Sequence, residues 1–273
     1  MKDRRFFPAN DRIAHTSLDG QVSLPVTEGS VLRVTVAATD LRSAPAGPRD
    51  KQLLHGWSFR VLEQRNGWAF GFDVVDGYVG YVAAADLGAH SDPTHRIQAR
   101  QTHIYSEPDI KSPEIGMLSF LSEIAVTDTT VGFHALKGGG FVPAQHVAPL
   151  SWRAEDAAGT AVLFRNTPYL WGGNTGWGLD CSGLVQLALH AAGQGCARDS
   201  DLQANIGHPI EHQSDLMRGD LVFWNGHVGM MLDPDLLIHA NAHHMAVAVE
   251  PLADAIARIG QKEFGAVTGF RRP

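Results

Sequence analysis

Apolar and polar residues alternate in short runs over the first third of the chain. Between residues 30 and 90 these runs are separated by turn dipeptides, among them Asn66-Gly67 and Asp76-Gly77. Short strands at about ten-residue spacing, with turns between them, are typical of a small β-barrel. We therefore predict one barrel here, with strands at residues 32–36, 58–62, 68–72 and 78–82.

The same pattern recurs in weaker form between residues 96 and 150. Residues 105–108 resemble residues 41–45, and residues 141–147 resemble residues 81–87. Self-similarity at a fixed distance indicates a repeated structural unit. We predict two copies of one barrel, joined near residues 90–93. The alternative is chance similarity between two β-rich segments.

After residue 151 the pattern changes to one that mixes helices and strands. An alanine-rich segment at 154–164 and an apolar stripe within 181–192 predict two helices. Apolar runs then follow on both sides of an Asn225-Gly226 turn, which is a strong hairpin signal. These predicted strands are residues 221–224, 227–232 and 236–240. Helices followed by strands are typical of an α+β domain.

Composition narrows the classes of function. The 273 residues include only two cysteines, which excludes a disulfide framework and a Cys₄ zinc site. The formal net charge of −7 argues against a nucleic-acid partner. No apolar stretch is long enough for a transmembrane helix, so no membrane partner is expected. The basic N-terminus lacks the apolar core of a secretory signal, and we expect a cytoplasmic protein.

Cys181 is the first candidate for chemistry, because it stands at the predicted start of a helix. The N–H groups and partial positive charge of a helix start stabilise a thiolate, which is the nucleophilic form of cysteine. Ser182 and Gly183 follow and leave room for a substrate. The alternative is an inert buried cysteine. Cys196 lies roughly 20 Å further along a helix, so we predict no disulfide and a structural role.

A thiolate nucleophile needs a histidine that takes up and returns its proton. His227 opens one predicted strand and His239 closes the next, twelve positions later. An even separation around a short odd-length loop places both side chains on one face of the sheet. One ring can then orient the other, which gives the hypothesis of a Cys181–His227–His239 triad.

A metal site is the alternative use of the histidines in this part of the chain. The candidate ligands are His212, His239, His243 and His244. They lack a companion carboxylate or thiolate at ligand spacing. We therefore expect neither a metal nor another cofactor.

Several motifs resemble the NlpC/p60 family of cell-wall cysteine peptidases. Residues 168–173 (PYLWGG) and 178–185 (GLDCSGLV) resemble its nucleophile region, and residues 218–229 resemble its base segment. Residues 237–240 (LIHA) resemble its third, polar position. The ordered set extends from about residue 155 to the C-terminus and is highly specific. The two upstream repeats resemble bacterial SH3-like domains.

This resemblance implies a multidomain protein, with two small all-β SH3-like barrels followed by an α+β, papain-like catalytic domain. The implied boundaries are an extension at 1–29, barrels at 30–90 and 96–150, and a peptidase domain at 151–273. Two such barrels before a peptidase are similar to the γ-D-glutamyl-L-diamino-acid endopeptidases of murein-peptide recycling.

The resemblance also implies roles for single residues. Cys181 would be the nucleophile, His227 the base and His239 its orienter, and Tyr169 would line the site near the oxyanion. Four residues would hold the free α-amine of an N-terminal L-Ala, namely Asp180, Ser182, Asp199 and Ser200. An Asp before a helix is also an ordinary N-cap, which is the alternative for both acids.

In the related enzymes the first barrel walls off the substrate pocket with a tyrosine and an acid. Tyr78 or Tyr81 would be that tyrosine, and the alternative is a role in the barrel core or rim. The acid that follows the arginine of the early Leu-Arg strand is missing here, because residues 43–45 read Ser-Ala-Pro. This is the point at which the sequence departs from the related enzymes.

The implied activity is hydrolysis of the bond between γ-D-glutamate and the diamino acid of murein peptides with a free N-terminal L-Ala. The partner would be a murein-derived peptide, and the diamino acid would be diaminopimelate or lysine. Two alternatives stay open at this point. One is a cysteine amidase or acyltransferase of the same fold, and the other is a non-catalytic protein that binds wall peptides.

Overall fold

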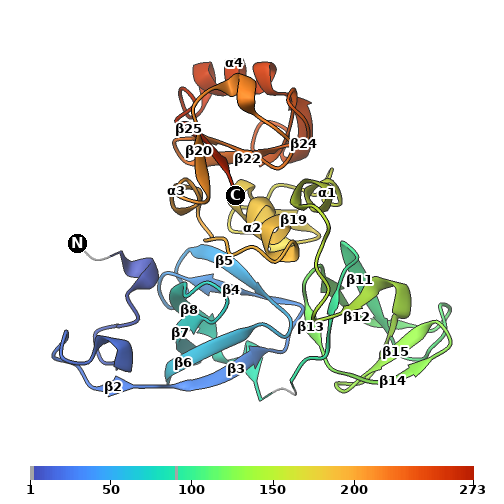
Figure 1. Ribbon diagram of the computed structural model, residues 1–273. Helices are drawn as coiled ribbons and strands as arrows, with labels where there is room; N and C mark the ends of the chain where they lie inside the picture. The colour runs from blue at the N-terminus through green and yellow to red at the C-terminus, as the bar shows by residue number, and fades with distance from the viewer. Residues whose placement is uncertain (1–2, 90–91) are drawn as a thin grey trace. The chain divides into compact units, whose positions relative to one another are not determined.

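The structure is a computed structural model that describes residues 3–89 and 92–273 (Figure 1). Its contacts divide the chain into two compact units, Met1–Ser151 and Trp152–Pro273. The division coincides with the change of sequence pattern after residue 151. The expected joint between the barrels begins at residues 90 and 91, which lie outside the described residues.

The N-terminal unit begins with short elements that precede the first barrel. They are the 3₁₀ turns η1 (Arg4–Phe6) and η2 (Thr16–Leu18) and the parallel pair β1 (Ala14–His15) and β2 (Val26–Thr27). Arg12 ties this segment to the barrel, because its guanidinium donates to the carboxylate of Glu63 at 2.8 Å.

The first barrel is one seven-stranded sheet in the order β5-β4-β8-β7-β6-β3-β9. Its elements are β3 (Ser30–Val34), β4 (Ala38–Arg42), β5 (Arg49–Leu54), β6 (Ser58–Arg65), β7 (Trp68–Asp73), β8 (Val79–Ala83), η3 (Ala84–Asp86) and β9 (Leu87–Gly88). The predicted strand at 32–36 ends at Val34, because the next N–H, that of Thr35, donates to Asp86 outside the ladder.

Strand β5 has no apolar alternation, because it carries a buried lysine. Lys51 is fully buried, and its Nζ donates to Asp73 at 2.7 Å and to Asp76 at 2.6 Å. Two carboxylates offset the cost of burying the ammonium. Burial, the largest influence, raises the pKa of Asp73 to about 6, against the opposing effect of Lys51.

The strands that follow form two sheets, β13-β10-β17 and β12-β11-β16-β15-β14. Their elements are β10 (His95–Ile97), β11 (Gln101–Tyr105), β12 (Glu114–Ser119), β13 (Glu123–Ile124), β14 (Val126–Thr130), β15 (Phe133–Leu136), β16 (Phe141–Pro143), η4 (Ala144–His146) and β17 (Val147–Pro149). The strand pairings repeat those of β3–β9 in chain order, with β13 and β14 together in the place of β6. This shared order supports the predicted repeat.

Hydrogen bonds to backbone carbonyls join the two halves of the N-terminal unit. Trp57 donates from its indole nitrogen to the carbonyl of Leu121 at 3.0 Å, and the N–H of Glu123 donates to the carbonyl of His55 at 2.9 Å. Gly56 lies between these bonds at φ +80°, where a Cβ would come within 2.1 Å of the Glu123 oxygen. Only glycine fits this close approach.

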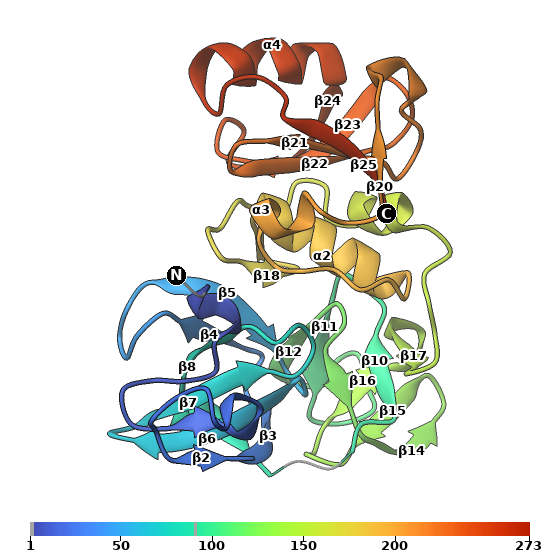
Figure 2. The same ribbon diagram turned by 60° about the vertical axis from the view of Figure 1, so that its left-hand side comes forward.

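The C-terminal unit is built on a six-stranded sheet in the order β20-β25-β21-β22-β23-β24 (Figure 2). Its strands are β18 (Asn174–Thr175), β19 (Gly178–Leu179), β20 (His208–Ile210), β21 (Leu221–Trp224), β22 (His227–Met231), β23 (Leu236–Asn241), β24 (Ala246–Pro251) and β25 (Gly269–Arg272), of which β18 and β19 form a separate pair. Its helical segments are α1 (Ala157–Val162), α2 (Cys181–Ala191), α3 (Ser200–Gln203), η5 (Gln213–Asp215) and α4 (Leu252–Lys262).

Helices cover both faces of this sheet (Figures 1 and 2). Helix α2 contacts β22 and β23 from one side, and α4 contacts β23 and β24 from the other. The α4 layer is sealed by a core that includes Leu237, Leu252, Ala255 and Ile259. The predicted meander is confirmed, whereas α4 and β25 lie beyond the elements that the sequence patterns predicted.

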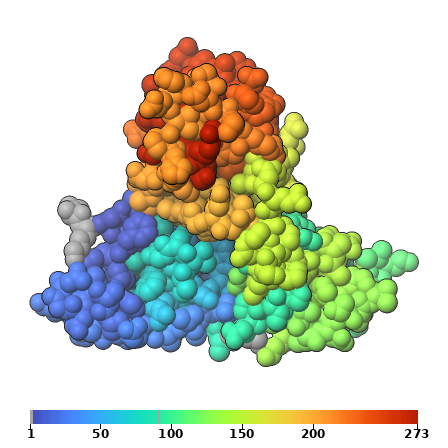
Figure 3. Space-filling model, viewed as in Figure 1, coloured from blue at the N-terminus to red at the C-terminus, as the bar shows by residue number. Residues whose placement is uncertain are grey.

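Helix α1 is shorter than the predicted segment 154–164. It starts after Asp156, whose carboxylate accepts the N–H groups of Ala158 and Gly159, so the cap fixes the first helical residue at Ala157. The end of the chain pairs with β20 and lies at the surface of this unit, where it is red in Figure 3. Among the described residues, no helix is both long enough and apolar enough to cross a membrane.

Candidate active site

Cys181 is the first residue of α2, as the sequence predicts. The preceding residue, Asp180, caps the helix, and its Oδ1 accepts the N–H of Gly183 at 2.7 Å. Only glycine fits at position 183, because a Cβ there would lie 2.5 Å from the carbonyl oxygen of Gly173. The run Asp-Cys-Ser-Gly therefore folds into a tight helix start that presents the cysteine at its first turn.

A buried arginine holds this helix start in place. Arg198 is 1% exposed and donates to Asp180 at 2.8 Å, to Ser182 Oγ at 2.7 Å and to the Gly173 carbonyl at 3.1 Å. Asp180 also accepts the N–H of Gly172 at 2.8 Å. Both carboxylate oxygens of Asp180 are thus engaged by the protein itself, and the hydroxyl of Ser182 is bound by Arg198.

The thiol of Cys181 is neutral in the resting protein. Burial, and secondly the charge of Asp180, raise its pKa to about 12, although the N–H groups of Val228 and Ser182 and the charge of Arg198 act in the opposite direction. The expected thiolate stabilisation at the helix start is therefore outweighed by desolvation. The N–H of Val228 acts on the sulfur directly, which places the thiol beside the start of β22, where His227 precedes Val228.

The structure brings the two predicted histidines together. Nε2 of His227 lies 2.8 Å from Nδ1 of His239, and both rings are buried. The β22–β23 register pairs Met230 with Ile238 and Met231 with Leu237, so the histidines share one face at a diagonal step. The structure therefore contains the ring-nitrogen hydrogen bond that the triad hypothesis requires.

Glu250 extends the histidine pair and is absent from the predicted site. Its Oε1 lies 2.7 Å from Nε2 of His239, and Arg258 of α4 donates to the same oxygen. Burial alone would raise the pKa of Glu250, but hydrogen bonds from His239 and Arg258 lower it to about 2. Glu250 pairs with Leu237 across the β23–β24 hairpin, so it lies on the same face of the sheet as His239. The sequence could show this only if the register of the two strands were already known.

Two aromatic rings enclose His227. Phe264 stacks on the imidazole with ring centroids 5.3 Å apart and planes 8° apart, and Trp224 lies at 5.6 Å. Burial, followed by the neighbouring His239, lowers the pKa of His227 to about 3. Burial also lowers the pKa of His239, against the opposing effect of Glu250. Both rings are therefore neutral near pH 7.

These low histidine pKa values predict an acid-sensitive fold. The pKa of His227 falls from the ordinary 6.5 to about 3 on folding. Between these two pH values the imidazole is protonated in the unfolded chain and neutral in the folded chain. The free energy of unfolding should therefore decrease as the pH falls from 6.5 towards 3. The variant His227→Gln lacks this group and should lose about 2–4 kcal/mol less between pH 7 and pH 4. Urea titrations at both pH values measure this difference, and equal losses in the two proteins would contradict it.

Tyr169 lies close enough to Cys181 for a thiolate there to affect the pKa of its phenol. Its backbone N–H donates to Met245, and the residue bridges to Leu179 just before the helix start. Burial, followed by the charge that Cys181 carries when it is ionised and by the charge of Asp180, raises the pKa of the phenol above its usual range. The phenol therefore keeps its proton and stays a hydrogen-bond donor beside Cys181.

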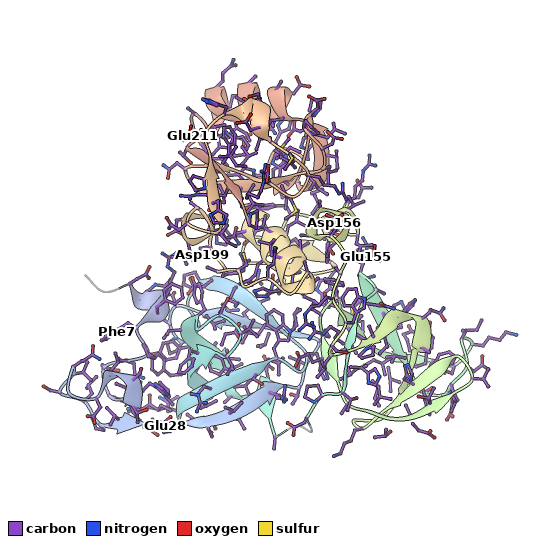
Figure 4. All side chains as sticks on the ribbon, viewed as in Figure 1. Phe7, Glu28, Glu155, Asp156, Asp199 and Glu211 are labelled. Carbon is purple, nitrogen blue, oxygen red and sulfur yellow. The ribbon has the colours of Figure 1, made fainter. Side chains whose placement is uncertain are left out.

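Asp199 and Ser200 lie at the start of α3, where Asp199 is labelled in Figure 4. The carboxylate of Asp199 makes no capping bond to the helix, unlike that of Asp180. Asp199 is also close enough to Arg198 to raise the pKa of that guanidinium. Arg198 therefore bonds to Asp180 and Ser182 and also lies within electrostatic range of Asp199.

The predicted wall tyrosines both lie in the first barrel. Tyr78 is 2% exposed, its ring is 6.3 Å from that of Phe6, and the ammonium of Lys51 lies 5.8 Å from its centroid. Tyr81 is half-buried and packs on Phe70 with ring centroids 5.0 Å apart. Both rings therefore contribute to barrel packing.

The remaining cysteine and histidine candidates lie apart from this arrangement. Neither Cys181 nor Cys196 forms a disulfide, and the thiol of Cys196 donates to the carbonyl of Ala197. His243 packs edge-on against His244 at the β23–β24 turn, while His239 uses both ring nitrogens within the array. Within residues 3–89 and 92–273, no three potential ligands come together as a metal site would need.

Two segments of the chain match known families. Residues 166–259 match the NlpC/P60 family, a match that includes Cys181 and both histidines of the array. Residues 41–87 match the family described as the bacterial dipeptidyl-peptidase Sh3 domain.

Two curated relatives resemble most of the chain. The gamma-D-glutamyl-L-lysine dipeptidyl-peptidase of Bacillus subtilis (strain 168) is 28% identical over 195 residues, which cover 66% of this chain and 66% of that protein. Dipeptidyl-peptidase 6 of Lysinibacillus sphaericus is 27% identical over 230 residues, which cover 74% of this chain and 83% of that protein.

A solved structure resembles the fold over most of the chain. An NlpC/P60 family protein from Bacillus cereus ATCC 10987 gives a TM-score of 0.75 at 19% identity, covering 89% of this chain and 99% of that chain. A likeness at this level of identity establishes the fold alone.

Proposed function

The chain carries a bacterial SH3 domain followed by an NlpC/P60 domain, and from this premise we propose that it is a cysteine peptidase of murein peptides. The bond cleaved would be that between γ-D-glutamate and the diamino acid, in peptide turnover or recycling. The observation that carries the proposal is the array of Cys181, His227 and His239 at the meeting point of α2 and β22.

The array supports a two-step acyl transfer. Nε2 of His227 is engaged by His239, so Nδ1 is the nitrogen that takes the proton of Cys181. The sulfur then attacks the γ-carbonyl carbon, and the carbonyl π electrons move to oxygen. As the tetrahedral species collapses, His227 returns the proton to the leaving amine and a thioester remains. Water, deprotonated by His227, releases the acid and restores the thiol.

The oxyanion of the tetrahedral species needs donors that are already in place. The first turn of α2 supplies backbone N–H groups, and the neutral phenol of Tyr169 supplies a hydroxyl donor. The uncharged state of Tyr169 matters, because a phenolate would repel the oxyanion.

The names of the relatives support a substrate with a free N-terminus, because a dipeptidyl-peptidase releases an N-terminal dipeptide. A carboxylate is the natural partner of that ammonium, and Asp199 is partly exposed. We propose Asp199 with Ser200 for this role, because the carboxylate of Asp199 does not cap α3, whereas Asp180 and Ser182 hold the start of α2 through Arg198.

The experiment compares L-Ala-γ-D-Glu-diaminopimelate with its N-acetylated form. The free peptide should yield the dipeptide L-Ala-γ-D-Glu, and acetylation should lower kcat/KM about 10- to 100-fold, since it removes one charge-assisted hydrogen bond. Products are quantified by chromatography and mass spectrometry. A parallel lysine-containing peptide shows which diamino acid is preferred.

Asp199→Asn should reduce this discrimination, whereas Asp201→Asn, on the exposed side of the same short helix, should preserve it. Equal cleavage of blocked and free peptides would contradict amine recognition and favour the amidase alternative. Transfer of the dipeptide to an added amine would favour the acyltransferase. Binding without cleavage would favour a non-catalytic protein.

A further inference from the structure

The catalytic array continues beyond its third member to a helix on the far side of the sheet. Glu250 accepts from His239 and from Arg258, and its side chain is only 13% exposed. Arg258 also donates to Glu263 at 2.6 Å, next to the ring of Phe264 that stacks on His227. One arginine therefore holds both the end of the hydrogen-bonded chain and the segment that covers its base.

We propose that Glu250, held by Arg258, is a positioning residue that sets which ring nitrogens of His239 and His227 carry protons, so that Nδ1 of His227 is bare and can take the proton of Cys181. The inference deepens the proposed function and rests on it for its catalytic meaning. Its structural part, the pattern of protons, can be tested without any substrate.

Each ring nitrogen takes its protonation state from its hydrogen-bond partner, beginning at Glu250. An ionised carboxylate only accepts, so Nε2 of His239 must carry a proton and donate to Glu250. A neutral imidazole has one N–H, so Nδ1 of His239 must accept. The atom that faces it, Nε2 of His227, must therefore donate. A second neutral ring with its proton on Nε2 has a bare Nδ1, which is the protonation state that a base requires.

Without the carboxylate this order is lost. A glutamine can turn its amide so that it donates to His239, and then both rings can carry their protons on Nδ1. In that pattern Nδ1 of His227 holds a proton already and cannot take another from Cys181. The carboxylate also faces the positive charge that develops on His227, and Arg258 prevents it from turning away. The arginine matters because its planar fork can reach Glu250 and Glu263 together.

The test variant is Glu250→Gln, with Asp156→Asn as the matched control. Asp156 is also an arginine-paired carboxylate of this unit, but its partner is Arg218 and it contacts no histidine (Figure 4). Asparagine still caps α1 at that position. Two readouts need no murein peptide, namely the ¹⁵N resonances of the imidazole nitrogens and the rate at which iodoacetamide alkylates Cys181, followed by peptide mass spectrometry.

In the unmodified protein, the ¹⁵N resonances should show His239 and His227 both protonated at Nε2. Glu250→Gln should slow alkylation of Cys181 and lower kcat by about 10- to 100-fold with KM little changed, because Glu250 touches no substrate. The effect should stay below the roughly 10⁴-fold cost of losing a direct partner of a catalytic histidine. Asp156→Asn should leave both rates unchanged.

Protons on Nδ1 of either ring in the unmodified protein would overturn the proposal. So would a folded Glu250→Gln protein with unchanged alkylation. If that variant does not fold, Arg258→Met keeps the carboxylate but frees it, and an unchanged alkylation rate there would also count against the proposal. Failure of the murein peptide to be cut would refute the proposed function, while the resonances and the alkylation rate still decide the role of Glu250.

Discussion

Cys181→Ala is expected to lower kcat/KM for L-Ala-γ-D-Glu-diaminopimelate by about 10⁴-fold or more, because the attacking sulfur is removed while the fold is kept. The cap of α2 is formed by Asp180 and Gly183, so the helix start does not depend on the thiol. Progress curves with the purified protein, normalised by its folded fraction, measure the loss.

The chain provides a matched control in its second cysteine. Cys196 also forms no disulfide and is buried in the same unit, and its thiol donates to the backbone carbonyl of Ala197. Cys196→Ala should cost about 1 kcal/mol of stability and leave cleavage intact. Undiminished cleavage by Cys181→Ala, or equal losses in both variants, would remove Cys181 from the role of nucleophile.

Arg198→Met is expected to lower the free energy of unfolding by about 3–5 kcal/mol, the largest stability effect we anticipate in this protein. The substitution leaves the carboxylate of Asp180 buried without its counter-ion, and it also removes the bonds to Ser182 and to the Gly173 carbonyl. The same loop carries the N–H that Gly172 donates to Asp180, so the start of α2 should loosen together with it.

A second substitution separates charge burial from lost packing. In the double variant Arg198→Met with Asp180→Asn no charge is left unpaired, and asparagine still caps the helix. Stability should then recover in part relative to Arg198→Met, which gives a favourable coupling in the double-mutant cycle. Urea unfolding followed by tryptophan fluorescence provides the values. Additive losses would show that the ion pair is not the reason for the effect.

The parts of the candidate site that depend on residues close together in the sequence could be predicted. The residues around Cys181 define a helix start over a few positions, and the twelve-residue separation of His227 and His239 defines one face of a hairpin. Both rules act between neighbours in the sequence or across a single turn. Strand β5 was not predicted, because its buried lysine interrupts the apolar alternation and the compensating carboxylates come from the end of β7 and from the turn after it.

Glu250, Arg258 and Phe264 show what local rules miss. Glu250 needs the register of β24, Arg258 needs α4 to pack on that face of the sheet, and Phe264 needs the segment after α4 to return over His227. Each of these depends on the packing of an element that the apolar pattern did not predict. Their charges and rings are therefore visible in the sequence, but their partners are not.

By itself, the sequence indicated the candidate nucleophile, the histidine pair proposed to serve it and the division into β-rich and α+β parts, because these follow from periodicity and from residues close along the chain. Only the tertiary structure decided the protonation state of the site. Burial keeps Cys181 protonated and His227 neutral, against the expectation from the helix start alone. Desolvation depends on everything that covers a group, and those covering elements are brought together only when the chain folds.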